Sequence, residues 1–423
     1  MNTVANLIDK AMGEHPAATT AHNANPSNEP ETFADPSGET MLALAWYGNG
    51  DVRMVEANKP RVVDATDAVI KITGTTVCGS DLHLLHGALV EMQKGDILGH
   101  EFMGIVESVG DKVTKVKPGD RVVASFNLAC GDCQVNSSSL MNAMYGNRTC
   151  GMSGYSHLTS GFAGGQAEYA RVPYGDANLL KIPDSVPDES ALYLSDILVT
   201  SYHQVVDSGV KEGDIVGIWG AGAIGVFCAQ WSLLKGASRI IVIDNVQWRL
   251  DFMKEKFGDK VDPVNFNEYK DVAKRVNEMT KRGTHGLDPT RPEGVDVALE
   301  CAAGEYAKSF THKIEMATGL ETDTSEILNE MILSVRNFGT VGITGVYAGF
   351  TNHLNIGSVM QKGVRLIGNG QAPVHKYWQE ILDDYLVPGK VDPRDLIVSH
   401  RIPLQDVAKC YTEFDKREKH IVK

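Results

Sequence analysis

One stretch decides the fold of this 423-residue chain: Ile218-Trp219-Gly220-Ala221-Gly222-Ala223-Ile224-Gly225. It contains the pattern GxGxxG between an apolar strand-like run, Asp214–Trp219, and a segment with helical spacing, Ala223–Lys235. In such a unit the first glycine allows a tight turn, the second lets the backbone approach a pyrophosphate, and the third lets helix and strand pack closely. The free N–H groups of the helix start, at Ala223 and Ile224, would face the phosphates. The pattern alone also fits an ordinary glycine-rich turn, so the neighbouring sequence must distinguish a dinucleotide site from such a turn.

A second strand pattern, Arg239–Ile243, ends at Asp244, 19 positions after Gly225. An acidic side chain at this place accepts hydrogen bonds from the ribose hydroxyls and repels a 2′-phosphate, so we expect NAD rather than NADP. Arg249 follows five residues later, either as an adenine-side contact or as a solvated helix residue. Strand and helix patterns alternate from about residue 185 to 370, which indicates an α/β fold with a parallel sheet.

The pattern divides the chain into parts. Residues 1–40 are poor in large apolar side chains and are expected to form a flexible tail. Residues 41–195 contain short β-like runs separated by turn signals such as Lys117-Pro118-Gly119-Asp120, and we expect residues 366–423 to pack back onto them. Residues 196–365 form the predicted dinucleotide-binding domain.

Composition excludes several classes of protein. Lys and Arg total 40 and Asp and Glu total 54, which gives a formal charge of −14 and argues against a nucleic-acid or anionic-membrane partner. Seven cysteines are too few for a disulfide framework. The longest weakly polar run, Ile215–Ala229, is shorter than the about 20 residues that span a membrane. We expect a cytoplasmic protein without a membrane segment.

Two clusters carry residues that bind metals: Cys78-Gly79-Ser80-Asp81-Leu82-His83 and Gly99-His100-Glu101. A thiolate and an imidazole are good zinc ligands, and a catalytic zinc uses three protein ligands with one open position. A single cysteine is more often a small buried apolar residue, and a single histidine is often only hydrogen-bonded. The residues alone therefore leave a metal site and a purely structural interpretation open.

The chain resembles the zinc-dependent medium-chain dehydrogenase/reductase (alcohol dehydrogenase) family over about residues 41–423. The matching pieces are the two clusters above, Lys117–Val122, the GxGxxG stretch and Asp244. Within the family it looks most like the glutathione-independent formaldehyde dehydrogenases, through Gly164–Tyr169, Leu194–Ile197 and Gly370–Val374. The resemblance implies a GroES-like β-rich catalytic domain and a Rossmann-type coenzyme domain.

The resemblance also implies roles for single residues. Cys78 and His100 match two catalytic zinc ligands, and Asp196 lies where many members have a second Cys. Glu101 would either support the zinc ligands or exchange onto the metal. Ser80 and His83 match the proton-relay positions. Three further positions are expected to contact the cofactor: Thr200, Val346 and Gln371.

One part departs from the family pattern. The structural-zinc lobe of the family has four cysteines, of which Cys130 and Cys133 fit the first two, whereas Asn136 and Met144 hold the next two places. Cys150 has the wrong spacing. Two thiolates do not complete a tetrahedral site, so we expect one catalytic zinc per chain and no structural zinc. The resemblance implies a homodimer or homotetramer.

The predicted reaction is hydride transfer to NAD from formaldehyde hydrate or another small alcohol or aldehyde, without glutathione. Zinc would act as a Lewis acid, and Ser80 would pass the substrate proton toward His83. Two alternatives stay open: a polyol or secondary-alcohol dehydrogenase of the same family, and a dinucleotide-binding protein without turnover. The altered cysteine lobe motivates the second alternative.

Overall fold

The computed structural model describes residues 29–87, 91–131, 151–281, 290–302, 324–345, 347, 351–370, 372–416 and 421–423. Most of the predicted tail, Cys133, Cys150, Val346 and Gln371 lie outside these ranges, so the expectations about them are not addressed by the structure. The chain divides into two compact units, one formed by Met1–Val199 with Gln371–Lys423 and the other by Thr200–Gly370.

The second unit is built on a six-stranded parallel sheet with the order β13-β12-β11-β14-β15-β16. Its strands are β11 (Ile215–Trp219), β12 (Arg239–Asp244), β13 (Val261–Asn265), β14 (Val295–Glu300), β15 (Val335–Ile343) and β16 (Arg365–Gly368). The two central strands are buried along their whole length, as expected when both faces of a parallel sheet are covered. This is the strand order of the doubly wound dinucleotide fold, and the predicted fold class is confirmed.

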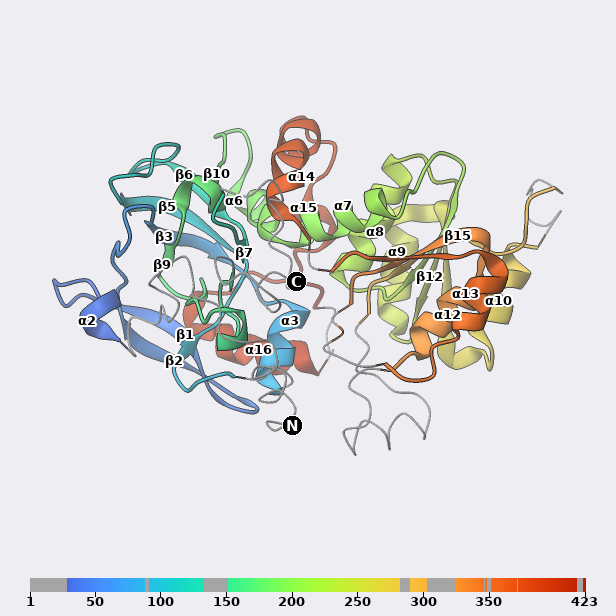
Figure 1. The fold of residues 1–423 in the computed structure, drawn as a ribbon, viewed down its shortest axis with the longest axis horizontal. Coiled ribbons are helices and arrows are strands. Elements are labelled where there is room, and N and C mark those ends of the chain that lie inside the picture. The colour runs from blue at the N-terminus through green and yellow to red at the C-terminus, as the bar shows by residue number, and fades with distance from the viewer. Residues whose placement is uncertain are drawn as a thin grey trace. The chain divides into compact units, whose positions relative to one another are not determined.

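Helices flank this sheet in Figure 1. They are α8 (Ala223–Leu234), α9 (Gln247–Phe257), α10 (Val272–Met279), α12 (Glu326–Ser334) and α13 (Ile356–Lys362), with short 3-10 turns at Gly258–Lys260 and Phe266–Glu268. Helix α7 (Ile197–Asp207) continues from the first unit into the second. Trp219, Ile241 and Met331 belong to a core that joins sheet and helices.

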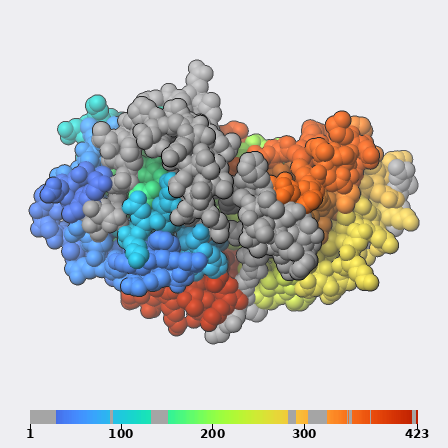
Figure 2. All heavy atoms as spheres, turned by 60° about the horizontal axis from the view of Figure 1, so that its bottom comes forward, coloured from blue at the N-terminus to red at the C-terminus, as the bar shows by residue number. Residues whose placement is uncertain are grey.

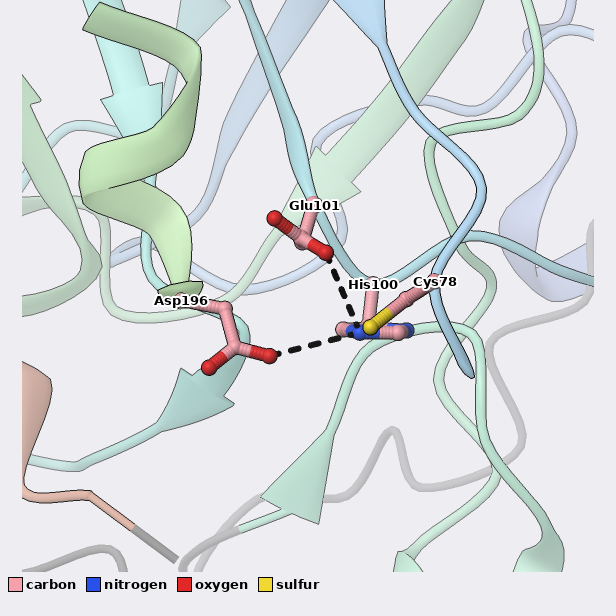
Figure 3. A group of neighbouring side chains, drawn as sticks. All are labelled: Cys78, His100, Glu101 and Asp196. Carbon is pink, nitrogen blue, oxygen red and sulfur yellow. Dashed lines mark ion pairs between the residues drawn. The ribbon is translucent and has the colours of Figure 1, made fainter. Parts of the chain in front are cut away.

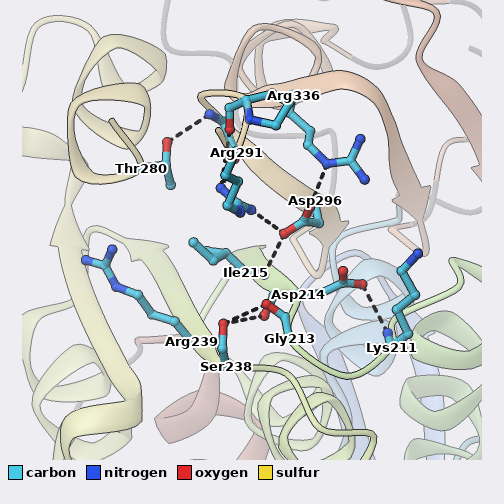
Figure 4. Close-up of polar contacts among 12 residues, drawn as sticks. Lys211, Gly213, Asp214, Ile215, Ser238, Arg239, Thr280, Arg291, Asp296 and Arg336 are labelled. Atoms are coloured by element: carbon cyan, nitrogen blue, oxygen red, sulfur yellow. Dashed lines mark hydrogen bonds and ion pairs between the residues drawn. The ribbon is translucent and has the colours of Figure 1, made fainter. Parts of the chain in front are cut away.

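Charged side chains gather at the amino end of the sheet (Figure 4). Asp296 accepts hydrogen bonds from the backbone N–H of Ile215 at 2.8 Å and from Arg336 Nε at 2.6 Å, and it also pairs with Arg291. Burial opposes ionisation of Asp296, but these donors lower its pKa below the ordinary value. The cluster lies at the end of the sheet opposite the glycine-rich turn, where it ties β11, β14 and β15 together.

The first unit is β-rich. Its five-stranded antiparallel sheet has the order β10-β6-β5-β3-β9, beside a three-stranded sheet β2-β1-β4 and the pair β7-β8. The strands are β1 (Thr40–Gly48), β2 (Asp51–Asn58), β3 (Ala68–Thr75), β4 (Asp96–Ile97), β5 (Phe102–Val109), β6 (Arg121–Ala124), β7 (Asn127–Leu128), β8 (Gly151–Met152), β9 (Tyr169–Val172) and β10 (Leu179–Lys181). Alternate side chains fill a core that includes Ile70, Phe102 and Val122.

The C-terminal segment packs onto this β-rich unit. Asn127 Nδ2 donates to the carbonyl of Ala372 at 2.6 Å, and Tyr411 donates to Gln166 Oε1 at 2.8 Å. Helix α16 (Val407–Asp415) lies against β2, and Figure 2 shows these red and blue segments in contact. Among the described residues, no helix is both long and apolar enough to cross a membrane.

The remaining elements of the first unit are short. They are α2 (Pro30–Phe33), α3 (Gly79–Leu85), α5 (Gly175–Asn178), α6 (Asp188–Ala191), α14 (Val374–Ile381) and α15 (Pro393–Leu396), a π-helical turn at Leu382–Leu386, and 3-10 turns at His157–Thr159, Leu192–Ser195 and Leu404–Asp406. Helix α3 and the turn Leu192–Ser195 are the two that position candidate ligands.

Candidate functional site

Cys78 lies in the loop between β3 and α3, directly before the helix. Its backbone N–H donates to Asp81 Oδ2 at 2.8 Å, and the N–H of Asp81 returns to the Cys78 carbonyl at 3.1 Å. An acid three residues into a helix satisfies a free N–H of the first turn in this way. The reciprocal bonds fix the backbone that presents the Cys78 thiol.

His100 and Glu101 lie directly before β5, and both side chains are almost fully buried. The preceding Gly99 has φ +97°, and a Cβ there would approach Gln166 Cγ to 2.5 Å, so only glycine fits at this turn. Thr75 Oγ1 donates to the Glu101 carbonyl at 2.9 Å. These contacts hold the His-Glu pair beside the end of β3.

Asp196 lies between the 3-10 turn Leu192–Ser195 and α7. The carbonyl of Ser195 accepts from the backbone N–H of Phe126 at 3.1 Å, which ties this turn to the β-rich unit. The Asp196 side chain is mostly buried. A residue 96 positions from His100 is thereby brought to the same place as the two ligand clusters.

The side chains of Cys78, His100, Glu101 and Asp196 converge, and one potential ligand atom from each lies within 4.8 Å of all the others (Figure 3). His100 Nε2 is 3.4 Å from Asp196 Oδ2 and 3.6 Å from Glu101 Oε1. Neither ring nitrogen of His100 makes a hydrogen bond, although the ring is buried. A sulfur, an imidazole nitrogen and carboxylate oxygens at these distances fit a zinc ion, so the residues present suit the predicted metal.

The surroundings of His100 orient its ring. Asp81 Oδ1 lies 3.3 Å from His100 Nδ1, and Tyr155 meets the ring edge-on at a centroid distance of 5.1 Å. Burial lowers the pKa of His100, but Tyr155, Asp81 and Asp196 raise it well above the ordinary value. A carboxylate on the far nitrogen of a ligand histidine fixes the ring orientation and makes the other nitrogen a better donor.

Glu101 has a cationic partner of its own. The Nζ of Lys423 forms an ion pair with Glu101 Oε1, and both side chains are at most 2% exposed. Burial raises the pKa of Glu101, and the Lys423 ammonium opposes that shift. Burial alone lowers the pKa of Lys423, whereas Cys78 and Glu101 raise it, with a net increase.

The proposed relay residues lie on α3. Ser80 Oγ is 3.8 Å from Cys78 Sγ, and Tyr155 hydrogen-bonds to Ser80. His83 is three residues after Ser80, so both lie on one face of the helix. Burial raises the pKa of Tyr155, so its phenol stays protonated and can donate a hydrogen bond. The structure places Ser80 beside a candidate ligand, and the route of a proton through His83 stays a prediction.

The glycine-rich turn has the local geometry expected from its sequence. Gly220 has φ +110°, and a Cβ there would lie 2.7 Å from the Cys301 carbonyl. A Cβ on Gly225 would lie 2.0 Å from the Gly220 carbonyl, so helix and strand touch there. A Cβ on Gly222 would meet no protein atom within 4 Å. The second glycine therefore faces open space where a ligand backbone could approach, whereas the other two serve packing.

Asp244 closes the turn from the end of β12. Its Oδ2 accepts from the N–H of Ala221 at 2.7 Å, and its Oδ1 accepts from the N–H groups of Asn245 and Val246. Oδ2 accepts one of these bonds and has a second lone pair, so a ribose hydroxyl could still donate to it. The Arg249 guanidinium lies over the ring of Trp248, and Thr200 is buried on α7. Their contacts to the cofactor stay predictions.

Sequence reasoning did not single out Asp81, Tyr155 or Lys423 as parts of the site. The capping-box spacing from Cys78 to Asp81 was a usable signal. Glu300, at the end of β14, was also missed: its side chain accepts from the N–H of Ala302 at 2.9 Å and from that of Gly345, which anchors the loop after β15. Lys423 lies 322 residues from Glu101 and carries no local signal.

A GroES-like β unit with a Cys-His-carboxylate cluster, together with a doubly wound dinucleotide fold, defines a zinc-dependent medium-chain dehydrogenase. Residues 64–184 match the family model described as alcohol dehydrogenase GroES-like domain. A zinc-type alcohol dehydrogenase-like protein of Schizosaccharomyces pombe (strain 972 / ATCC 24843) is 36% identical over 100% of this chain and 97% of the relative. The chain belongs to the zinc-type alcohol dehydrogenase-like family, as its resemblance predicted.

Two further similarities bear on fold and substrate. The glutathione-independent formaldehyde dehydrogenase of Pseudomonas aeruginosa (strain LESB58) is 30% identical, covering 88% of this chain and 94% of the relative. The structure of alcohol dehydrogenase TADH from Thermus sp. ATN1 has a TM-score of 0.74 and 31% identity, covering 90% of this chain and 98% of that one. The chain is thus a zinc-dependent alcohol dehydrogenase-like oxidoreductase.

Proposed function

We propose that the protein oxidises formaldehyde hydrate, or another small alcohol or aldehyde, with NAD as hydride acceptor and without glutathione. The observation that carries the proposal is the convergence of Cys78, His100 and Asp196 on one point, with Glu101 beside them. The similarity to a glutathione-independent formaldehyde dehydrogenase supports the substrate class, and the ligand set supports the metal.

Cys78, His100 and Asp196 would hold the zinc, which supplies Lewis-acid polarisation of the substrate oxygen when bound. The protein supplies orientation and proton transfer. Ser80 would accept the substrate hydroxyl proton and pass it to His83, which lies one turn later on α3. Asp81 would keep the His100 ring in the orientation that directs Nε2 toward the other ligands.

Four features of the second unit support NAD as the cofactor. The GxGxxG turn follows β11 and opens α8, its second glycine is open, and Asp244 ends the next strand. The negative charge of Asp244 would accept from a ribose hydroxyl and disfavour a 2′-phosphate. The start of α8 would offer backbone N–H groups to the pyrophosphate.

Metal analysis combined with a screen of NAD reduction tests the proposal. We expect one zinc per chain and NADH formation with formaldehyde. Faster NADH formation with polyols than with formaldehyde would instead indicate a polyol or secondary-alcohol dehydrogenase of the same family. Cys78→Ala should lose zinc and turnover while still binding NAD, and Cys410→Ala, on α16, is the matched thiol control. Full turnover by Cys78→Ala would refute the ligand assignment, and NAD binding without turnover by zinc-replete protein would refute the enzymatic proposal.

A further inference from the structure

Lys423 is a buried cation placed against the metal-ligand cluster. Its side chain is 2% exposed, and its Nζ pairs with Glu101 Oε1. Burying an ammonium group is costly unless it has a charged partner, so such a contact persists only where the surrounding structure maintains it. Here the partner is one of the four side chains whose ligand atoms converge.

The backbone around Lys423 is fixed by Ser399. Ser399 Oγ donates to the Lys423 carbonyl at 2.8 Å and accepts from the N–H of Val422 at 3.1 Å. The side chain therefore reaches Glu101 from an anchored backbone. The ammonium is held at Glu101 on the side of Oε1, the oxygen that lies 3.6 Å from His100 Nε2.

Glu101 is a fourth potential ligand in this cluster. If it bound the metal together with Cys78, His100 and Asp196, four protein ligands would complete a tetrahedral zinc site and close the position that a substrate needs. A structural zinc site is closed in this way, whereas a catalytic site has three protein ligands. Some feature must therefore keep the Glu101 carboxylate from becoming a full-time ligand.

We propose that Lys423 is a positioning residue: it holds the Glu101 carboxylate away from the metal, so that the metal has three protein ligands. This inference rests on the proposed function, because it presupposes a zinc held by the other three side chains. When the ammonium is removed, Glu101 is left as a buried carboxylate without its cation, which is strongly unfavourable, and the metal becomes the available positive charge. The lysine thus determines the number of protein ligands without touching the substrate.

The test compares Lys423→Met, Glu101→Gln and the double variant with the wild type. Their zinc release to a chelator and the visible absorption of the cobalt(II)-substituted proteins are measured. With Lys423→Met we expect slower zinc release than from the wild type, because Glu101 would add a fourth protein ligand. The cobalt spectrum should shift and should no longer respond to added azide, because the open position is filled.

The double variant separates positioning from general stability. It has neither the buried ammonium nor the carboxylate charge, so it should fold and should release zinc at the rate of Glu101→Gln alone. Lys423→Arg, which keeps a cation at this position, should have the cobalt spectrum of the wild type. Lys59→Met is the control for loss of a buried lysine, since Lys59 is 11% exposed and pairs with Glu39 and Glu107 away from the ligand cluster.

The outcomes also separate this inference from the proposed function. Wild-type protein without bound zinc would overturn the proposed function itself. Suppose instead that the wild type binds zinc, but Lys423→Met releases zinc at the wild-type rate and has the wild-type cobalt spectrum. This result would overturn only the role of Lys423. The same holds if the effect of Lys423→Met persists in the Glu101→Gln background, because the lysine would then act through another group.

Discussion

The glycines of the dinucleotide turn provide a matched pair of variants that separates packing from ligand approach. In Gly225→Ala the new methyl group would lie 2.0 Å from the Gly220 carbonyl, whereas ordinary contacts lie at 3.4–4 Å, so α8 must move away from the turn. In Gly222→Ala the methyl group meets no protein atom within 4 Å, and the backbone at φ −77° suits alanine. The two substitutions are chemically identical but differ in what the new atom meets.

The expected magnitudes follow from these distances. Overpacking at Gly225 should cost about 1–3 kcal/mol of unfolding free energy and lower the melting temperature by several degrees. Gly222→Ala should melt like the wild type, but its methyl group would occupy the space that a pyrophosphate approaches. We expect at least a tenfold rise in the dissociation constant for NAD, about 1.4 kcal/mol. Thermal melts and fluorescence titration with NADH measure the two effects separately.

Either variant can refute the reasoning. If Gly222→Ala binds NADH as tightly as the wild type, the open side of the turn is not where the cofactor binds. If Gly225→Ala melts at the wild-type temperature, the contact between α8 and the Gly220 carbonyl does not constrain the fold. Loss of binding in Gly225→Ala alone would decide nothing about the cofactor, because the turn itself moves in that variant.

Further predictions concern buried charges and cofactor choice. Arg171→Met should lower the unfolding free energy by about 3–5 kcal/mol in chemical denaturation, because Asp67 is fully buried and would lose its cation. Loss of the exposed ion pair between Arg394 and Asp392 should have a far smaller effect, because solvent screens it. Burial raises the pKa of Glu300 from 4.5 to about 8, so the native carboxyl binds a proton that the unfolded chain releases, and this contribution to stability falls as pH rises through that window. Glu300→Gln should flatten that slope, and an unchanged slope would argue against the assignment. Asp244→Asn should narrow the preference for NAD over NADP in steady-state kinetics, and an undiminished preference would show that another group makes the choice.

The dinucleotide fold could be predicted because its signals are local. A glycine pattern, a strand before it, a helix after it and an acid at the end of the next strand all lie within about 30 residues, as in a βαβ unit. The resulting unit has the expected parallel sheet, and its strands have the order of the doubly wound dinucleotide fold. The charged cluster around Asp296, at the amino end of the sheet, could not be predicted, because its arginines come from segments that only the fold brings together.

The candidate metal site shows the same limit within a single cluster. Cys78 and His100 were recognisable because each lies in a short glycine-containing motif, and Asp81 could have been found from its capping position. Asp196 was inferred only through the family resemblance. Lys423 has no local pattern, because its partner Glu101 lies before β5, far away in the sequence. Its importance comes from burial and charge rather than from spacing. Residues that bind a metal are therefore easier to infer from sequence than the residues that limit how many of them bind. The latter depend on a balance of buried charges that exists only once the chain has folded.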